Sequence, residues 1–154
     1  MGRPSFLADC NVGRLARWLR VMGYDAEFEP VLADGFVVWR ALHEGRVLLT
    51  RDRELTRRRL ITTGQVRAIL LRDDDVQAQL RQVAGELGLD GSSSLTRCLE
   101  CNVVLEPRPF EVVAHRVPFH VRAAQTRFAA CPRCGRVYWP GSHWQRMQER
   151  LAAL

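Results

Sequence analysis

The sequence contains no lysine, and all 23 of its basic residues are arginine. It has no apolar run approaching the roughly 18 residues that a membrane-spanning helix needs. Its first thirty residues carry Arg, Asp and Glu, where a secretory signal would have an apolar segment. The lack of a long apolar run and the charged first thirty residues exclude a membrane-spanning or secreted protein, so we expect a cytoplasmic location and no membrane partner.

Length and charge are those of a small globular protein with a basic second part. The chain has 154 residues, of which 47% are apolar, enough for one buried core or for one domain with a small appendage. Residues 1–90 hold 14 arginines against 13 acidic residues, whereas residues 91–154 hold 9 arginines against 4. Forked guanidinium groups suit the phosphates of nucleic acids, although charge alone is a weak indication of such a partner.

The first part of the chain alternates between strand-like and helix-like patterns. Short apolar runs are each followed by a segment with apolar residues at helical spacing, such as Val12, Leu15 and Leu19 before a stop at Gly23. The expected strands cover residues 5–9, 25–29, 46–50 and 65–71, and the expected helices cover 11–23, 34–43, 52–60 and 74–88. This alternation predicts an α/β fold, a parallel sheet flanked by helices.

A Gly/Ser-rich segment, LDGSSSLT at 89–96, marks the expected boundary. We therefore predict a first domain at 1–90, a linker at 91–96 and a small second domain at 97–154. The segments 97–113 and 127–141 look like short strands around paired cysteines, and a helix is expected from Ser142. Ser142 and Gln145 have the spacing of a capping box, and Trp144, Met147 and Leu151 form an apolar stripe on that helix.

Four of the five cysteines follow a metal-binding pattern. Cys98 and Cys101 form one C-x2-C pair, Cys131 and Cys134 form a second, and 29 residues separate the pairs. Tetrahedral Zn²⁺ takes four thiolates, so the spacing predicts a structural zinc ribbon. Two disulfides or four unpaired thiols remain the alternatives. The fifth cysteine, Cys10, is either a small buried side chain or a reactive thiol.

Carboxylates follow three of the four expected strands. Asp9 follows the first strand, Asp52 the third, and Asp73, Asp74 and Asp75 the fourth, while Asp34 opens an intervening helix. Because the carboxyl ends of parallel strands converge on one rim, we expect these side chains to meet there. Clustered carboxylates repel one another unless a cation lies among them, and Mg²⁺ or Mn²⁺ prefers oxygen ligands. Such a site supports hydrolysis of phosphodiesters.

Four arginines near this rim could hold the flanking phosphates of a nucleic acid: Arg14, Arg17, Arg51 and Arg53. The alternatives for these groups are structural, because Asp34 and Asp74 are also suited to helix capping and arginine runs often form a solvated face. A receiver-like phosphotransfer domain also has acids after the first and third strands, but such domains usually need a lysine that this chain lacks.

Several long segments carry a family resemblance. FLADCNVGRLARWLRVMGYD, RVLLTRDREL, RCLECN and YWPGSHWQRM resemble the Mut-seven C-terminal RNase domain family, which has a PIN-like nuclease fold and a zinc ribbon. The resemblance implies a metal-dependent ribonuclease whose acidic residues correspond to Asp9, Asp34, Asp52 and one of Asp73–Asp75. The chain departs from many relatives at Cys10, where they have Ala, and at Gly35, where an acidic residue is common.

The leading hypothesis is therefore a ribonuclease that acts on single-stranded RNA with Mg²⁺ or Mn²⁺ at the carboxylates and Zn²⁺ at the cysteines. Its fold would be a PIN-like α/β domain followed by a four-cysteine zinc ribbon and a C-terminal helix. The alternative is an RNA-binding or adaptor protein with a degenerate catalytic rim and a basic ribbon. The sequence leaves open whether the chain associates with copies of itself.

Overall fold

A computed structural model describes residues 2–31 and 33–154 of the chain. The chain divides into two compact units, one made of residues up to Leu19 together with Tyr24–Asp90, the other of Arg20–Gly23 together with Gly91–Leu154. Among the residues described, no helix has the length and apolarity required to cross a bilayer. The two units are described in turn.

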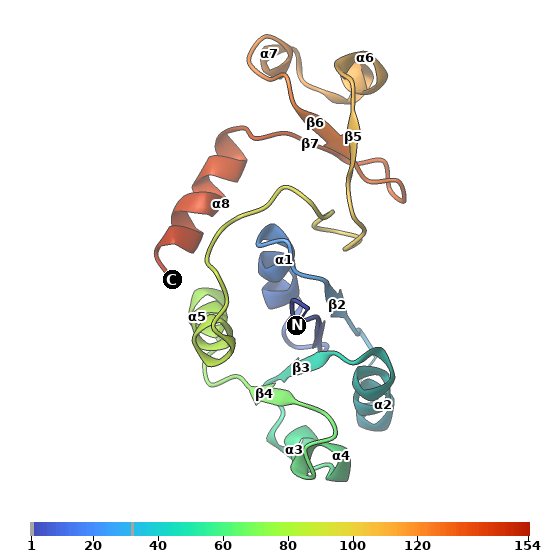
Figure 1. The fold of residues 1–154 in the computed structure, drawn as a ribbon, viewed down its shortest axis with the longest axis vertical. Helices are drawn as coiled ribbons and strands as arrows, with labels where there is room; N and C mark the ends of the chain where they lie inside the picture. Colours follow the sequence, from blue (N-terminus) through green and yellow to red (C-terminus); the bar gives the residue numbers. More distant parts are fainter. Residues whose placement is uncertain (1, 32) are drawn as a thin grey trace. The chain divides into compact units, whose positions relative to one another are not determined.

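The first unit is built on a parallel sheet of strand order β2-β1-β3-β4 (Figure 1). Its strands are β1 (Phe6–Ala8), β2 (Ala26–Phe28), β3 (Val47–Thr50) and β4 (Ala68–Leu70). Its helices are α1 (Gly13–Val21), α2 (Asp34–Glu44), α3 (Arg53–Thr56), α4 (Arg59–Thr62) and α5 (Val76–Leu87). The predicted parallel sheet flanked by helices is confirmed.

The strand order places helices on both faces of the sheet. The chain moves one way from β1 to β2 and the opposite way from β2 to β3, and right-handed crossovers then put α1 and α2 on opposite faces. Figure 1 shows α1 and α5 on one side of the sheet and α2, α3 and α4 on the other.

Strand side chains alternate between the two faces, and both sets are buried. Leu7 and Leu48 belong to a cluster with Val37, Val38 and Leu55 from the helices on their side. The intervening strand residues are also less than 4% exposed: Phe6, Ala8, Leu49 and Ile69. A strand buried on both faces needs a continuous apolar run, which explains why these segments are apolar until they end.

The expected helix at 52–60 is two short helices, so that prediction was wrong in detail. α3 ends at Thr56 and α4 begins at Arg59, and between them Arg58 has a non-helical backbone with φ of −59° and ψ of 141°. Leu55 lies in the core cluster, and Leu60 packs against it. Five residues of continuous helix would turn these side chains about 140° apart, so the break allows both to reach one core.

The second unit contains an antiparallel sheet of order β5-β6-β7. Its strands are β5 (Glu106–Arg108), β6 (Phe128–Ala130) and β7 (Val137–Tyr138), and between the first two lie α6 (Phe110–Val113), a 3₁₀ helix η1 (Ala114–Arg116) and α7 (Phe119–Arg122). The segment FEVV was expected as strand but forms α6. Val113 in α6, the extended Val117 after η1 and Val121 in α7 all bury around Phe128, and this tertiary packing overrides the β propensity of valine.

The C-terminal helix α8 (Ser142–Ala152) is confirmed, but its predicted capping box is wrong. Gly141 is the N-cap, no side chain caps the helix, and the backbone N–H of Gln145 donates to the carbonyl of Gly141 at 3.0 Å. Ser142 therefore lies one residue too far into the helix for its hydroxyl to cap. The apolar stripe of Trp144, Met147 and Leu151 is buried, as predicted.

The central strand β3 provides a stability test. Leu48 is fully buried, whereas Leu42 on the outer side of α2 is 37% exposed. We expect Leu48→Ala to lower the free energy of unfolding by about 2–5 kcal/mol, because it removes packed methyl groups and leaves a cavity. Leu42→Ala should cost less than about 1 kcal/mol. Urea denaturation followed by circular dichroism measures both, and equal losses would contradict the assigned burial of β3.

Candidate functional site

The four predicted cysteine ligands lie together in the second unit. The sulfur atoms of Cys98, Cys101, Cys131 and Cys134 are all within 4.8 Å of one another, and all four cysteines are free rather than joined in disulfides. The Cys98 and Cys134 sulfurs are 3.7 Å apart. Four bonds of about 2.3 Å from a tetrahedral zinc would place sulfurs about 3.8 Å apart. The donor set therefore fits zinc.

The two cysteine pairs share one backbone design. In each pair the N–H of the second cysteine points to the sulfur of the first, at 3.4 Å for Cys101 and 3.5 Å for Cys134. The residue that follows each pair has a left-handed backbone, with φ of 66° at Asn102 and 73° at Gly135. This conformation suits Gly and is tolerated by Asn, which explains the residue types found after the pairs.

The surroundings of Cys98 favour its thiolate. Burial raises the pKa of the Cys98 thiol, but hydrogen bonds from the Tyr138 hydroxyl and from backbone N–H groups outweigh it and lower the pKa to about 7. The Tyr138 oxygen lies 3.3 Å from the Cys98 sulfur and accepts the N–H of Leu99 at 3.0 Å. Burial and the neighbouring thiols raise the pKa of Cys101 to about 12. One thiolate thus forms readily, and several together need a cation.

Asp9 and Thr50 are joined at the carboxyl ends of neighbouring strands. Asp9 is 5% exposed and directly follows β1, while the fully buried Thr50 ends β3. The Thr50 hydroxyl donates to one oxygen of Asp9, and the backbone N–H of Asn11 donates to the other at 3.0 Å. Asp9 is therefore held in one orientation by two donors from different segments.

Asp52 is tied to the same threonine and also caps a helix. Its backbone N–H donates to the Thr50 hydroxyl oxygen at 3.0 Å. Its carboxylate accepts the N–H groups of Glu54 at 2.9 Å and Leu55 at 3.3 Å, which makes it the N-cap of α3. Sequence reasoning missed Thr50, although its place as the last residue of a buried strand was a signal for it.

Asp34 lies within electrostatic range of the same region. It is the first residue of α2, after the N-cap Ala33, so the interpretation of Asp34 as the cap residue is wrong. Burial raises the pKa of the Cys10 thiol, and the negative charges of Asp9, Asp34 and Asp52 raise it further. Three carboxylates from three separate segments thus lie near enough to one thiol for their charges to disfavour its thiolate form.

The acidic run after β4 has mainly structural contacts. Asp75 is the N-cap of α5 and accepts the N–H of Ala78 at 2.9 Å, so the alternative that Asp74 caps this helix is wrong. Asp73 accepts the N–H of Asp75 at 2.8 Å. Asp74 is highly exposed and forms an ion pair with Arg51.

The arginines named as phosphate contacts are exposed. Arg14 and Arg17 lie on the outer side of α1, Arg51 follows β3, and Arg53 begins α3. Within residues 2–31 and 33–154, the cysteines are the only group of three or more His, Cys, Asp or Glu side chains close enough to share an ion. The carboxylates are therefore more widely spaced than the thiols.

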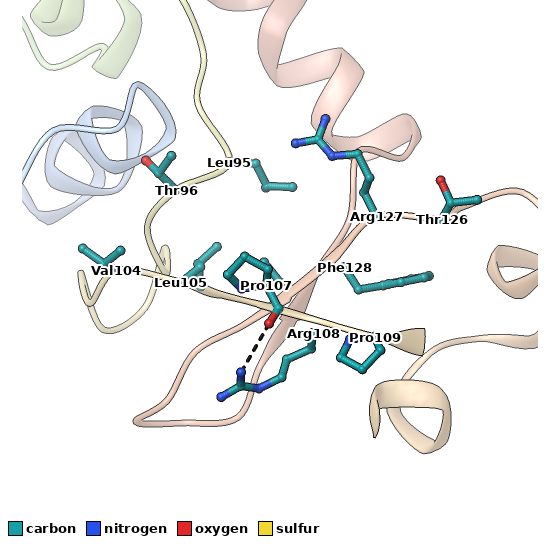
Figure 2. Close-up of a pocket in the computed structure, with 11 residues that line it drawn as sticks. Leu95, Thr96, Val104, Leu105, Pro107, Arg108, Pro109, Thr126, Arg127 and Phe128 are labelled. Atoms are coloured by element: carbon teal, nitrogen blue, oxygen red, sulfur yellow. Dashed lines mark hydrogen bonds between the residues drawn. The ribbon is translucent and has the colours of Figure 1, made fainter. Parts of the chain in front are cut away.

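A separate cleft of about 540 Å³ lies in the second unit (Figure 2). Its lining includes Pro107, Phe128 and the two arginines Arg108 and Arg127, and it contains no acidic residue or histidine. Arg108 donates to the carbonyl of Pro107 at 3.2 Å, the contact drawn as a dashed line. The cleft can bind an anionic or flat ligand, but it offers no group that could activate water.

Two substitutions at Asp52 test its cap of α3 and keep the backbone N–H that donates to Thr50. We expect Asp52→Ala to lower the free energy of unfolding by about 1 kcal/mol, because the N–H groups of Glu54 and Leu55 lose their acceptor. Asp52→Asn keeps an acceptor oxygen and should cost less than half as much. Urea denaturation of both variants tests this, and equal losses would show that the acceptor oxygen of the side chain does not stabilise α3.

Comparison with known proteins gives one match. No curated protein and no solved structure matches the chain. The family model described as Mut7-C RNAse domain matches residues 4–151, nearly the whole chain, and this range includes the cysteine cluster and all the carboxylates described above. The chain therefore belongs to the Mut7-C RNAse domain family, which suggests a nuclease-type function with RNA as the substrate.

Proposed function

We propose that the chain is a ribonuclease that hydrolyses single-stranded RNA with Mg²⁺ or Mn²⁺ at the acidic rim that includes Asp9, Asp34 and Asp52, where one or two of these carboxylates hold the ion together with water and phosphate. The observation that carries the proposal is the linkage of two strand ends, because the Thr50 hydroxyl donates to Asp9 after β1 and accepts the N–H of Asp52 after β3. Asp34 lies near enough to act electrostatically on the neighbouring Cys10. Asp73 and Asp74, at the end of the neighbouring strand β4, are proposed as outer members of the same acidic set.

The donor chemistry fits a hard cation. A carboxylate has about four lone-pair positions, and Asp9 uses two of them on Thr50 and Asn11. Mg²⁺ is commonly held by one or two carboxylates together with water and substrate phosphate, so the carboxylates need not form a closed cage. When bound, such an ion would neutralise charge on the phosphate and promote attack by water.

The chain's own residues would orient the reaction. The Thr50 hydroxyl donates to the Asp9 carboxylate and accepts the backbone N–H of Asp52. Thr50 therefore holds Asp9 and the start of the Asp52 loop at a fixed separation. Arg14, Arg17 and Arg53 are exposed and can pair with flanking phosphates. Arg51 could do the same after exchanging Asp74 for a phosphate oxygen.

The four cysteines are proposed to hold a structural Zn²⁺. A site closed by four thiolates leaves no position for substrate, so zinc would stabilise the second unit rather than take part in hydrolysis.

A second candidate function is RNA binding without cleavage. The cleft lined by Arg108, Arg127 and Phe128 favours it, because it combines cationic groups with an apolar floor. RNA binding that survives Asp52→Asn, in a protein that cleaves nothing, would support this alternative.

We expect cleavage of labelled single-stranded RNA to require added Mn²⁺ or Mg²⁺. Asp9→Asn and Asp52→Asn should each lower the rate about a hundredfold or more, because they remove charge that holds the ion. Glu54→Gln is the matched control, since Glu54 is an exposed acid only two residues from Asp52. Metal should be added rather than chelated, so that the cysteine site stays intact. Cleavage that is unchanged in Asp52→Asn would overturn the proposal.

Elemental analysis tests the zinc assignment. The parent should carry about one zinc per chain, and Cys101→Ser should lose most of it because one of four thiolates is gone. Cys10→Ser is the control and should keep its zinc. We also expect Cys101→Ser to make residues 91–154 more sensitive to trypsin than residues 2–90. Zinc retained in Cys101→Ser, or lost in Cys10→Ser, would contradict the assignment.

A further inference from the structure

The outer face of α2 carries three rings that the carboxylate site does not use, here called the aromatic row: Phe36, Trp39 and His43. Phe36 is 46% exposed and Trp39 is 50% exposed. The Phe36 and Trp39 rings are stacked, with centroids 5.9 Å apart and planes at 21°. The Trp39 and His43 rings follow at 4.2 Å and 32°. Exposed apolar rings are unfavourable in water, and a contiguous group of them on a protein surface usually marks a binding site.

The aromatic row is held rigidly. The Nδ1–H of His43 donates to the carbonyl of Trp39 at 3.1 Å, which fixes the imidazole beside the indole. The opposite face of α2 is anchored in the core by Val37, Val38 and Ala41. A ligand that stacked on these rings would therefore lose little free energy in ordering them.

The charge near the row is suited to a polyanion. The core cluster joins α2 to α3 and α4 through Leu55, Leu60 and Ile61. These two helices carry exposed arginines at their ends and between them: Arg53, Arg57, Arg58 and Arg59. Arg58 lies 3.8 Å from Asp34 at the start of α2.

The acids on the other flank of α2 are already paired. Glu27, Glu29 and Glu44 all form ion pairs with Arg40, at 3.5, 3.0 and 2.7 Å. Glu44 also pairs with Arg46 at 2.5 Å. Because Arg46 also pairs with Asp25, two arginines face four acids on this flank, which stays net negative. An anionic strand would therefore follow the α3 and α4 side of the row.

We propose that the aromatic row stacks against bases of single-stranded RNA while the arginines of α3 and α4 contact its phosphates. Stacking rings combined with a basic surface is the usual chemistry of proteins that bind single strands without sequence preference. The inference rests on the proposed function, since it takes RNA as the ligand, and it adds where the strand lies. The row begins two residues after Asp34, so it would lead the strand toward the proposed carboxylate site.

The dimensions favour a few bases over a second copy of the chain. From Phe36 to His43 the helix rises about 10 Å, which three rings fill in single file. A stable dimer usually buries about 800 Å² on each partner, and charged side chains border this row on its Arg40 side.

Binding should be measured with two labelled single-stranded probes of about 12 nucleotides, one with bases and one of equal charge without them. Every protein carries Asp52→Asn so that the probes stay intact, and fluorescence anisotropy gives Kd. We expect Trp39→Ala to weaken binding of the base-bearing probe about tenfold and to leave the abasic probe unchanged. Trp39→Phe should bind nearly as the parent does. Phe119→Ala is the control, because Phe119 is an 83% exposed aromatic in the second unit.

The salt dependence tests the arginine half of the proposal. Arg57→Gln and Arg59→Gln should each reduce the slope of log affinity against log salt by about 0.7, the value for one phosphate contact on a single strand.

Three outcomes would overturn the inference: unchanged affinity in Trp39→Ala, equal loss for both probes, or a parent dimer in sedimentation that Trp39→Ala dissociates. If affinity is unchanged in Trp39→Ala, or both probes lose affinity equally, while the protein with Asp52 still cleaves RNA with metal, the stacking proposal is wrong and the ribonuclease proposal stands. If binding of the base-bearing probe depends on Trp39 but the protein with Asp52 cleaves no RNA, the stacking proposal is supported and the ribonuclease proposal is wrong.

Discussion

The buried contact between Asp9 and Thr50 is the interaction on which the geometry of the carboxylates depends. Ala8 of β1 pairs in register with Leu49 of β3, which places the next residues, Asp9 and Thr50, side by side. A hydrogen bond to a charged group contributes roughly 1.5–3 kcal/mol, and this one is shielded from solvent. The same hydroxyl accepts the N–H of Asp52, so one side chain fixes two loops.

That contact in turn depends on the core. Leu7 and Leu48 face one side of the sheet, and their neighbours Ala8 and Leu49 face the other. A slip of one residue between β1 and β3 would turn every side chain to the wrong face, and it would also separate Asp9 from Thr50. Hydrophobic burial therefore sets the register, and the register sets the position of the carboxylates. A buried apolar strand can therefore end in a charged side chain whose position is fixed by the register of the sheet.

Local patterns made much of this fold predictable from the sequence, and longer-range contacts account for the rest. The alternation of strands and helices and the paired cysteines depend on neighbouring residues, and both appear in the structure. The break at Arg58 could not be predicted because it is set by where Leu55 and Leu60 must pack. Parallel topology led us to expect Asp9, Asp52 and the Asp73–Asp75 run at one rim, and the convergence of these carboxylates stays a prediction. Thr50 was missed although its place at the end of a buried strand was a signal, because only the structure shows which groups its hydroxyl joins. The turn contact of Asp73 and the cap contact of Asp75 were not predicted, because they follow from backbone geometry that the sequence does not display.

The carboxylates of the first unit and the four cysteines of the second unit differ in what compensates their negative charge. The four sulfurs lie within 4.8 Å of one another. The strands of their unit have only two or three residues, so the unit has a small core. A cation bound by the sulfurs would therefore contribute directly to folding. The carboxylates stay farther apart and are stabilised by donors of the chain itself: Thr50 and Asn11 for Asp9, α3 for Asp52, and Arg58 for Asp34. The first unit can therefore fold with its carboxylates charged and without an ion. Asp9 accepts one hydrogen bond on each oxygen, and Asp52 accepts both of its hydrogen bonds on a single oxygen. Lone pairs therefore remain on both carboxylates for a cation.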